Sequence, residues 1–189
     1  MTTPFDLGAT LERHGALLEG HFLLSSGRHS DRFVQKFRIL EEPSLLGPVA
    51  GALAAAFAAD RPSVVVSAAI GGIVLGYEVA RRLGTRAIFV EKERGMPTLR
   101  RGFALDAGDR VLVVEDVVTT GASVREVMEI VRSSGAALLG VGAIVRRGSV
   151  DFGVRTHVLL DLPLRSYDAA ECPQCAAGEA LQDPGSRRV

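Results

Sequence analysis

The stretch VLVVEDVVTTGAS, residues Val111–Ser123, decides the fold. Its four apolar residues Val111–Val114 are typical of a strand that is buried on both faces of a parallel sheet. Two carboxylates, Glu115 and Asp116, follow directly, and the small, hydroxylated run Thr119–Ser123 leads into residues with helical spacing. The stretch therefore predicts a strand, a turn and the start of a helix, in that order.

Similar apolar runs recur on both sides of this stretch. We expect a buried parallel strand at each of them: Val64–Ala69, Ala87–Glu91, Arg110–Glu115, Leu138–Val145 and His157–Leu160. Two segments with helical periodicity lie between them and end before Gly84 and Gly135, where helices commonly stop. Strands that alternate with helices predict an α/β fold with an open, mostly parallel sheet flanked by helices.

Two segments fall outside this alternation. The first is the N-terminal part, residues 1–40, which we expect to form a small added hood. The second is Lys92–Phe103, a basic stretch that contains glycine and proline and lies between two strands. We expect it to be a mobile hairpin loop that acts as a lid. The length of 189 residues suits a single domain, residues 1–189.

Composition limits the classes of function. The 22 basic and 22 acidic residues cancel, so no overall field attracts the chain to nucleic acid or to an anionic membrane. The uncharged stretch Pro62–Tyr77 is shorter than the roughly 20 residues of a membrane-spanning helix, and glycines interrupt it. The N-terminus does not resemble a secretory signal. We therefore expect a cytoplasmic protein without a membrane span.

The residues after the first strand have the chemistry of a phosphorylated sugar site. Adjacent carboxylates at Glu115 and Asp116 can accept hydrogen bonds from a vicinal diol and help to hold a hydrated Mg²⁺ ion. Small residues in Thr119–Ser123 let the backbone approach an anion, and free N–H groups at a helix start point toward it. The alternative is a solvated strand end followed by a helix cap. The P-loop spacing and the Rossmann fingerprint are both absent.

The cysteines and histidines are harder to interpret. Cys172 and Cys175 form the motif CPQC without a histidine nearby in the sequence. Three interpretations stay open: half of a metal site shared across a dimer, a redox pair, or two small residues at a turn before a short helix, which the incomplete spacing favours. His29 could approach a ligand, and we expect the other histidines to be surface or packing residues: His14, His21 and His157.

Val111–Ser123 resembles the phosphoribosyl-pyrophosphate motif of type I phosphoribosyltransferases, and four further segments narrow the resemblance to the orotate phosphoribosyltransferases. Phe22–Ser30, FLLSSGRHS, resembles their hood segment, and Ser67–Ile73, SAAIGGI, their small-residue pyrophosphate loop. Glu91–Phe103 matches their mobile basic loop in position, and Cys172–Arg187 resembles a tail seen in one bacterial branch. The resemblance covers nearly the whole chain.

The resemblance implies a role for each matching residue. Asp116 and the loop cations Lys92 and Arg94 would be catalytic. This loop lacks the histidine and the second lysine common in the family, so which cation acts is open. Orotate would pair its carboxylate with Arg147. The full set of implied substrate-binding residues is Ser26, Gly27, Glu115, Asp116, Val117, Val118, Thr119, Thr120, Gly121, Ala122, Ser123 and Arg147.

The resemblance also implies an activity. It is the transfer of ribose 5-phosphate from 5-phosphoribosyl 1-pyrophosphate to orotate, which gives orotidine 5-monophosphate and pyrophosphate in pyrimidine biosynthesis. Mg²⁺ would act on the pyrophosphate and ribose, and a homodimer would place each mobile loop at the partner's site. Two alternatives are a phosphoribosyltransferase for a purine or uracil, and a regulator that only senses the phosphoribosyl substrate.

Overall fold

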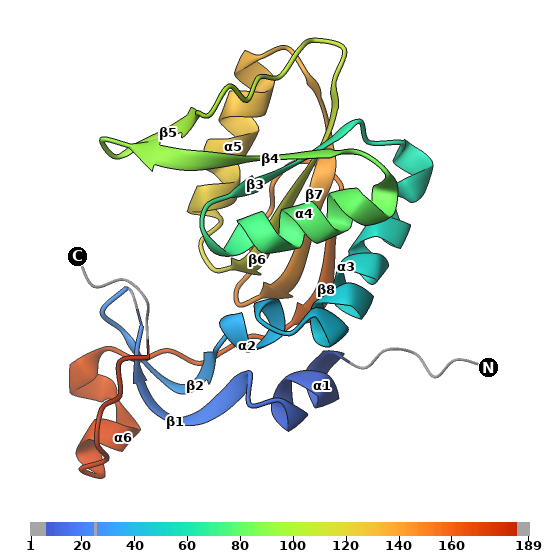
Figure 1. Ribbon diagram of the computed structural model, residues 1–189. Helices are drawn as coiled ribbons and strands as arrows, with labels where there is room; N and C mark the ends of the chain where they lie inside the picture. The colour runs from blue at the N-terminus through green and yellow to red at the C-terminus, as the bar shows by residue number, and fades with distance from the viewer. Residues whose placement is uncertain (1–6, 25, 185–189) are drawn as a thin grey trace.

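A twisted six-stranded sheet forms the centre of the molecule (Figure 1). The computed structural model describes residues 7–24 and 26–184. The strand order is β5-β4-β3-β6-β7-β8, and all neighbours pair in parallel except β4 and β5, which are antiparallel. The strands are β3 (Val64–Ala68), β4 (Arg86–Glu93), β5 (Met96–Leu99), β6 (Arg110–Val118), β7 (Ala137–Arg146) and β8 (Thr156–Asp161).

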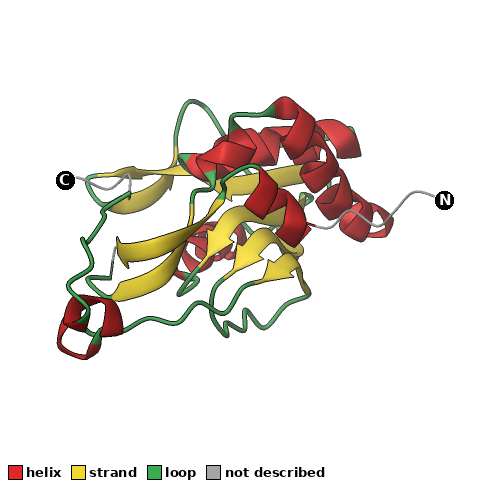
Figure 2. Cartoon of the chain, turned by 90° about the horizontal axis from the view of Figure 1, so that it is seen from below, coloured by secondary structure: helices red, strands yellow, loops and turns green. Residues whose placement is uncertain are grey.

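Helices cover both faces of this sheet, which explains why its strands are apolar without alternation. On one face lie α3 (Pro43–Phe57) and α4 (Gly71–Leu83), and on the other lies α5 (Ala122–Ser133), as Figures 1 and 2 show. The side chains of β6 divide between the two faces: Leu112 and Val114 belong to the core under α3 and α4, whereas Val111 and Val113 pack toward α5.

The predicted parallel strands and the two predicted helices are confirmed, but one boundary matters for the site. The expected strand Arg110–Glu115 continues to Val118, because Val117 and Val118 pair with Val145 and Arg146 of β7. Glu115 and Asp116 therefore lie inside the strand and share its rigidity. Helix α3 was not predicted; its apolar residues lie all round the helix, so the periodic signal is weak.

The segment Pro43–Asp60, which comprises α3 and the 3₁₀ turn η1 (Ala58–Asp60), is long and apolar enough to cross a membrane by length and composition alone. The core helix of a folded domain passes the same test. In the structure Val49, Leu53 and Phe57 of α3 are fully buried in the core beneath the sheet. The segment is thus weak evidence for a membrane span.

A second, smaller layer lies below the carboxyl ends of the strands (Figure 1). Its N-terminal part comprises α1 (Leu7–Arg13), the antiparallel hairpin of β1 (Leu17–Leu23) and β2 (His29–Val34), and α2 (Phe37–Leu40). The C-terminal segment, with η2 (Ala169–Glu171) and α6 (Pro173–Ala176), packs against this hairpin. The hood is therefore built from both ends of the described chain.

Backbone hydrogen bonds join the hairpin to the C-terminal segment. The N–H of Leu23 donates to the carbonyl of Gln182, and the N–H of Gln182 donates to the carbonyl of His21. His29 and Tyr167 exchange two further bonds, each of 2.9 Å. A two-stranded hairpin alone is marginally stable in water, so these contacts supply the support that it lacks.

The segment expected as a loop, Lys92–Phe103, is mostly a hairpin. Its first strand is the end of β4, its second is β5, and they turn at Arg94 and Gly95, which both have positive φ. At its base the ring of Phe103 packs edge-on against Phe89. The hairpin projects from the edge of the sheet (Figure 1).

Gly140 offers a test of the packing between β7 and the helix layer. A Cβ atom there would lie 2.5 Å from the backbone oxygen of Arg155 and 2.8 Å from the ring of Phe57. We expect Gly140→Ala to lower the free energy of unfolding by about 1–3 kcal/mol, because the backbone must shift. Denaturant unfolding measures the change. Gly108→Ala is the matched control, since a Cβ there meets nothing within 4 Å; equal effects of both variants would contradict the prediction.

Candidate functional site

The turn between β6 and α5 has the predicted order of strand, turn and helix. Gly121 ends the turn with φ of 76°, and a Cβ atom there would lie 2.8 Å from the side chains of Val150 and Phe152. Glycine is thus required both by conformation and by space. Helix α5 starts at the next residue, so the N–H groups of its first turn have no partner within the helix; that of Ala122 donates to Oγ1 of Thr120 at 3.4 Å, and Thr119 and Thr120 are exposed. This arrangement suits a bound phosphate.

Two adjoining hollows of about 490 and 570 Å³ open at this turn. They lie at the carboxyl ends of the strands, where α/β sheets bind ligands. The residues that line both are Leu24, Glu115, Val117, Thr119, Ser123 and Arg147. Every residue predicted to bind substrate lines at least one of them: Ser26, Gly27, Glu115, Asp116, Val117, Val118, Thr119, Thr120, Gly121, Ala122, Ser123 and Arg147. Ser25 lies outside the described residues.

The two carboxylates of β6 are almost covered, with Glu115 8% and Asp116 1% exposed. The Glu115 carboxylate accepts from the N–H of Asp116 at 3.1 Å, and the Asp116 carboxylate accepts from the N–H of Val117 at 2.6 Å. Burial, and then the neighbouring Asp116 carboxylate, raise the pKa of Glu115 to about 8. Glu115 is therefore largely protonated at neutral pH in the free chain and can donate as well as accept a hydrogen bond.

Lys36 belongs to the same site. It follows β2, and its Nζ donates to Oδ1 of Asp116 at 3.0 Å and lies 2.8 Å from Oδ2 in an ion pair. The two are 80 residues apart in the sequence, and Lys36 was not among the predicted site residues. The signal that could have indicated it is a single lysine, in VQKF, directly after the hood hairpin.

The loop after β3 allows this ion pair to form. A Cβ atom at Gly71 would lie 1.9 Å from Oδ2 of Asp116 and 2.9 Å from Nζ of Lys36, so only glycine fits there. Gly76 of α4 likewise approaches Ser67, which is buried at the end of β3. The small residues of Ser67–Ile73 thus bring the start of α4 close to β6, and Ala68 to Gly71 line the second hollow.

Arg147 presents an unpaired cation to the hollows. Its backbone N–H donates to the carbonyl of Val118, which anchors it beside the end of β6. Its Nε is buried and has no hydrogen-bond partner among residues 7–24 and 26–184. Burial lowers the pKa of the guanidinium from its ordinary value. A buried donor without a partner is costly, and an anion in the hollow would satisfy it.

The two predicted loop cations lie elsewhere in this chain. Nζ of Lys92 pairs with Oε1 of Glu126 on α5 at 2.9 Å, and Arg94 lies exposed at the tip of the hairpin. Neither lines the hollows. Of the histidines, His21 is buried, which agrees with the expected packing role, whereas His29, which could have approached a ligand, does not line the hollows.

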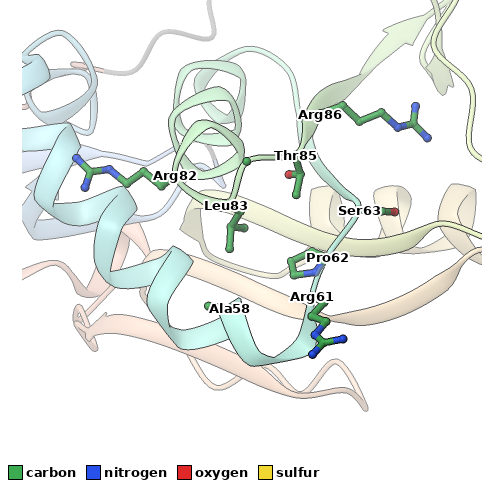
Figure 3. A pocket seen from close by; sticks show the side chains of 9 residues that line it. Ala58, Arg61, Pro62, Ser63, Arg82, Leu83, Thr85 and Arg86 are labelled. Atoms are coloured by element: carbon green, nitrogen blue, oxygen red, sulfur yellow. The ribbon is translucent and has the colours of Figure 1, made fainter.

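A third hollow of about 660 Å³ lies at the opposite end of the sheet (Figure 3). It is bordered by the end of η1 and by the turn from α4 to β4. Its arginines do not converge: Arg82 pairs with Glu78, and Arg86 pairs with Asp109. This hollow lies at the amino ends of the strands, so the carboxyl-end site is the better candidate.

Comparisons with known proteins agree with this geometry. Residues 38–159 match the family described as phosphoribosyl transferase domain. The chain is 50% identical over 186 residues to an orotate phosphoribosyltransferase of Pelotomaculum thermopropionicum, covering 97% of this chain and 98% of the relative. It is 49% identical to an orotate phosphoribosyltransferase of Thermotoga maritima, covering 94% and 96%.

A solved structure, the orotate phosphoribosyltransferase of Aeropyrum pernix, superposes with a TM-score of 0.72 at 30% identity and covers 83% of this chain and 94% of that one. The fold is thus that of the type I phosphoribosyltransferase class, as predicted from the sequence. Within that class, the chain belongs to the orotate phosphoribosyltransferase family.

The raised pKa of Glu115 predicts a pH dependence of stability. Between its ordinary value of 4.5 and about 8, the unfolded chain has released this proton and the folded chain retains it. This contribution to stability is therefore complete below about pH 4.5, falls as the pH rises and is lost above about pH 8. We expect Glu115→Gln to raise the Tm relative to the parent at about pH 8, and to do so less at about pH 5.

Thermal unfolding in the absence of ligand and divalent cations measures this difference. Glu12→Gln is the control, since Glu12 is exposed at the end of α1. A constant difference in Tm between Glu115→Gln and the parent across this pH range would contradict the prediction.

Proposed function

We propose that this protein transfers ribose 5-phosphate from 5-phosphoribosyl 1-pyrophosphate to orotate, releasing pyrophosphate and forming orotidine 5-monophosphate for pyrimidine biosynthesis. One observation carries the proposal: Arg147, whose buried Nε has no hydrogen-bond partner among the described residues, lines the same hollow as the turn Thr119–Ser123. A phosphate site and a separate anion site in one hollow fit two anionic substrates. The names of the relatives support the same choice.

In this proposal the 5-phosphate binds at the start of α5. Thr119, Thr120 and Ser123 supply hydroxyls, and the residues around Gly121 supply N–H groups of the first helical turn. Val117 and Val118 are the last two residues of β6 and lead into this turn. Each contact of an anion with a helix terminus contributes about 0.3–1 kcal/mol when exposed and more when partly buried. The site therefore needs no net positive charge on the chain.

The ribose hydroxyls would bind at Glu115 and Asp116. Lys36 holds Asp116 from the hood side, so the two carboxylates are positioned before the substrate arrives. As the bond from C1 to pyrophosphate loosens, positive charge develops on the ribosyl ring, and these carboxylates can stabilise it. Asp116 is the residue to which we assign this catalytic role.

The carboxylate pair also fits a Mg²⁺ ion. Carboxylate oxygens are the hard ligands that Mg²⁺ prefers, and the Glu115 and Asp116 side chains line the same hollow at the end of β6. Glu115 and Asp116 would help to hold the ion, which when bound supplies positive charge to the pyrophosphate and orients the ribose. A cation there would displace the proton from Glu115, since opposite charge favours the ionised carboxyl.

Base selection is assigned to Arg147 and the hood. Ser26 and Gly27 form the turn between β1 and β2 and line the hollows opposite Arg147. The guanidinium can bind the orotate carboxylate through two parallel hydrogen bonds. A neutral base offers no such partner and would leave the guanidinium unpaired.

The loop cations suggest a homodimer. Lys92 and Arg94 belong to the β4–β5 hairpin, which projects from the edge of the sheet (Figure 1), and neither lines the hollows of its own chain. We propose that the hairpin is mobile and closes over the partner's site, where its cations neutralise departing pyrophosphate. The balanced charge supports a cytoplasmic enzyme that acts on small molecules, without nucleic acid or membrane partners.

A steady-state assay with orotate, adenine, xanthine and uracil in parallel tests the proposed reaction. We expect turnover of orotate alone, and Arg147→Lys should raise KM for orotate by about 10–100-fold with little change in KM for 5-phosphoribosyl 1-pyrophosphate, because lysine keeps the charge and loses the bidentate geometry. Arg146→Lys is the control, since Arg146 pairs with Asp161 instead. Turnover of another base without orotate would refute the proposal.

The role of the hairpin has its own test. We expect Lys92→Ala or Arg94→Ala to lower kcat by about 100-fold, as removal of a cation that stabilises the transition state does. Glu126→Ala is the control for Lys92, because it breaks the same ion pair and leaves the cation in place. An exposed pair contributes about 0–1 kcal/mol to stability, so Glu126→Ala should be nearly fully active. If Lys92→Ala and Arg94→Ala are both fully active, the prediction is wrong and the hairpin is a solvated turn without a catalytic role.

A further inference from the structure

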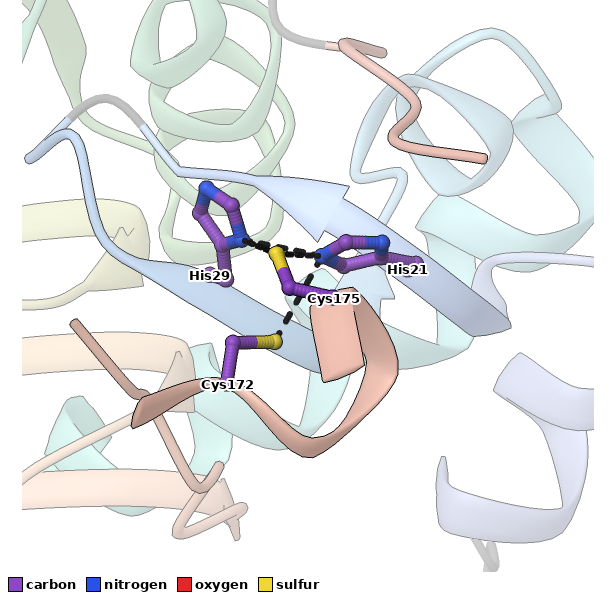
Figure 4. A group of neighbouring side chains, drawn as sticks. All are labelled: His21, His29, Cys172 and Cys175. Carbon is purple, nitrogen blue, oxygen red and sulfur yellow. Dashed lines mark hydrogen bonds between the residues drawn. The ribbon is translucent and has the colours of Figure 1, made fainter. Parts of the chain in front are cut away.

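Both cysteines and two of the four histidines of the chain meet at one point in the hood (Figure 4). The four residues are His21, His29, Cys172 and Cys175, and their potential ligand atoms all lie within 4.8 Å of one another. His21, His29 and Cys172 are buried, whereas Cys175 is exposed. None of the four lines the hollows of the candidate active site.

The hairpin places the two histidines together. Leu23 pairs with His29 across the strands, so His21, two residues before Leu23, points to the same face of the hairpin as His29. The cysteines come from the other end of the chain, where Cys172 precedes α6 and Cys175 lies in its first turn. This is why the sequence motif CPQC looked incomplete: its missing partners are about 150 residues away.

The distances from His21 to the two sulfur atoms match a tetrahedral site, and the two distances from His29 are somewhat shorter. Zn²⁺ binds nitrogen at about 2.0–2.1 Å and sulfur at about 2.3 Å, so ligand atoms at the corners of a tetrahedron are about 3.3–3.8 Å apart. Sγ of Cys172 and Sγ of Cys175 lie 3.5 and 3.6 Å from Nε2 of His21. Nδ1 of His29 lies 3.2 Å from Sγ of Cys175 and 2.9 Å from Nε2 of His21.

A neighbouring contact prepares His21 as a ligand. Nδ1 of His21 lies 3.0 Å from the carbonyl oxygen of Glu179. A carbonyl only accepts hydrogen bonds, so Nδ1 carries the proton and Nε2 presents its lone pair to the cluster. Metal-bound histidines commonly donate their other ring N–H to such a carbonyl, which orients the ring.

We propose that His21, His29, Cys172 and Cys175 form a structural Zn²⁺ site that joins the N-terminal hairpin to the C-terminal segment. Two thiolates balance the charge of the ion, so no uncompensated charge is left in the hood. Four protein ligands close the coordination shell, as in structural rather than catalytic zinc sites. The ion stabilises a hairpin that has little core of its own, and it thereby holds the turn at Ser26 and Gly27.

Metal content of the full-length protein, purified under reducing conditions from zinc-supplemented cells, tests the site. We expect about one zinc per chain in the parent and in His14→Asn, which changes an exposed histidine outside the cluster. Cys172→Ser and His21→Asn should lose the ion. Removal by a chelator should lower the Tm of the parent and of His14→Asn, and added Zn²⁺ should restore it.

Cobalt substitution keeps the test independent of how the variants fold. The reduced, metal-free parent titrated with Co²⁺ should develop the visible bands of a tetrahedral ion and the near-ultraviolet absorption of a thiolate–cobalt bond, saturating at one equivalent. Failure of the parent to bind either zinc or cobalt would overturn the proposal in favour of a hydrogen-bonded polar cluster. A native disulfide between Cys172 and Cys175, seen as a mass lower by two hydrogens, would overturn it in favour of a redox pair. These readouts do not depend on the proposed transferase activity.

Discussion

The ion pair between Lys36 and Asp116 is the interaction around which the site is built. An aspartate that is 1% exposed beside a second buried carboxylate needs a compensating charge, and Lys36 supplies it from the hood. The pair fits only because Gly71 has no side chain, so the start of α4 can approach β6. One contact thus joins three parts of the molecule: the central strand, the small-residue loop and the hood.

Local sequence was sufficient to predict the sheet and the order of strand, turn and helix around Thr119–Ser123. Val111–Val114 is a near-continuous apolar run because both faces of β6 are covered, and the small residues after it have one physical use. Residues that act together in the turn are also neighbours in the chain, from Thr119 to Ser123. Arg147 is positioned similarly, since it directly follows β7 and bonds to the last residue of β6.

Contacts between distant segments could not be predicted in this way. Lys36 meets Asp116 across 80 residues, and His21 meets Cys172 across 151, so no local spacing indicates either pair. Helix α3 was missed for another reason: its alanines and glycines give little contrast between its faces. The position of Lys92 and Arg94 depends on the hairpin of β4 and β5 at the edge of the sheet, and nothing in the spacing of residues 92–103 indicates its direction.

The pairing of distant segments in the hood has a consequence for biosynthesis. Ribosomes make the hairpin of β1 and β2 before the residues that support it, because its hydrogen-bond partners Tyr167 and Gln182 lie beyond the whole central sheet in the sequence. The strands of the central sheet can pair before the residues that support the hairpin have been synthesised. A nascent or truncated chain that ends before Tyr167 would therefore have the strands of the sheet and the turn Thr119–Ser123, but a hood hairpin without its hydrogen-bond partners.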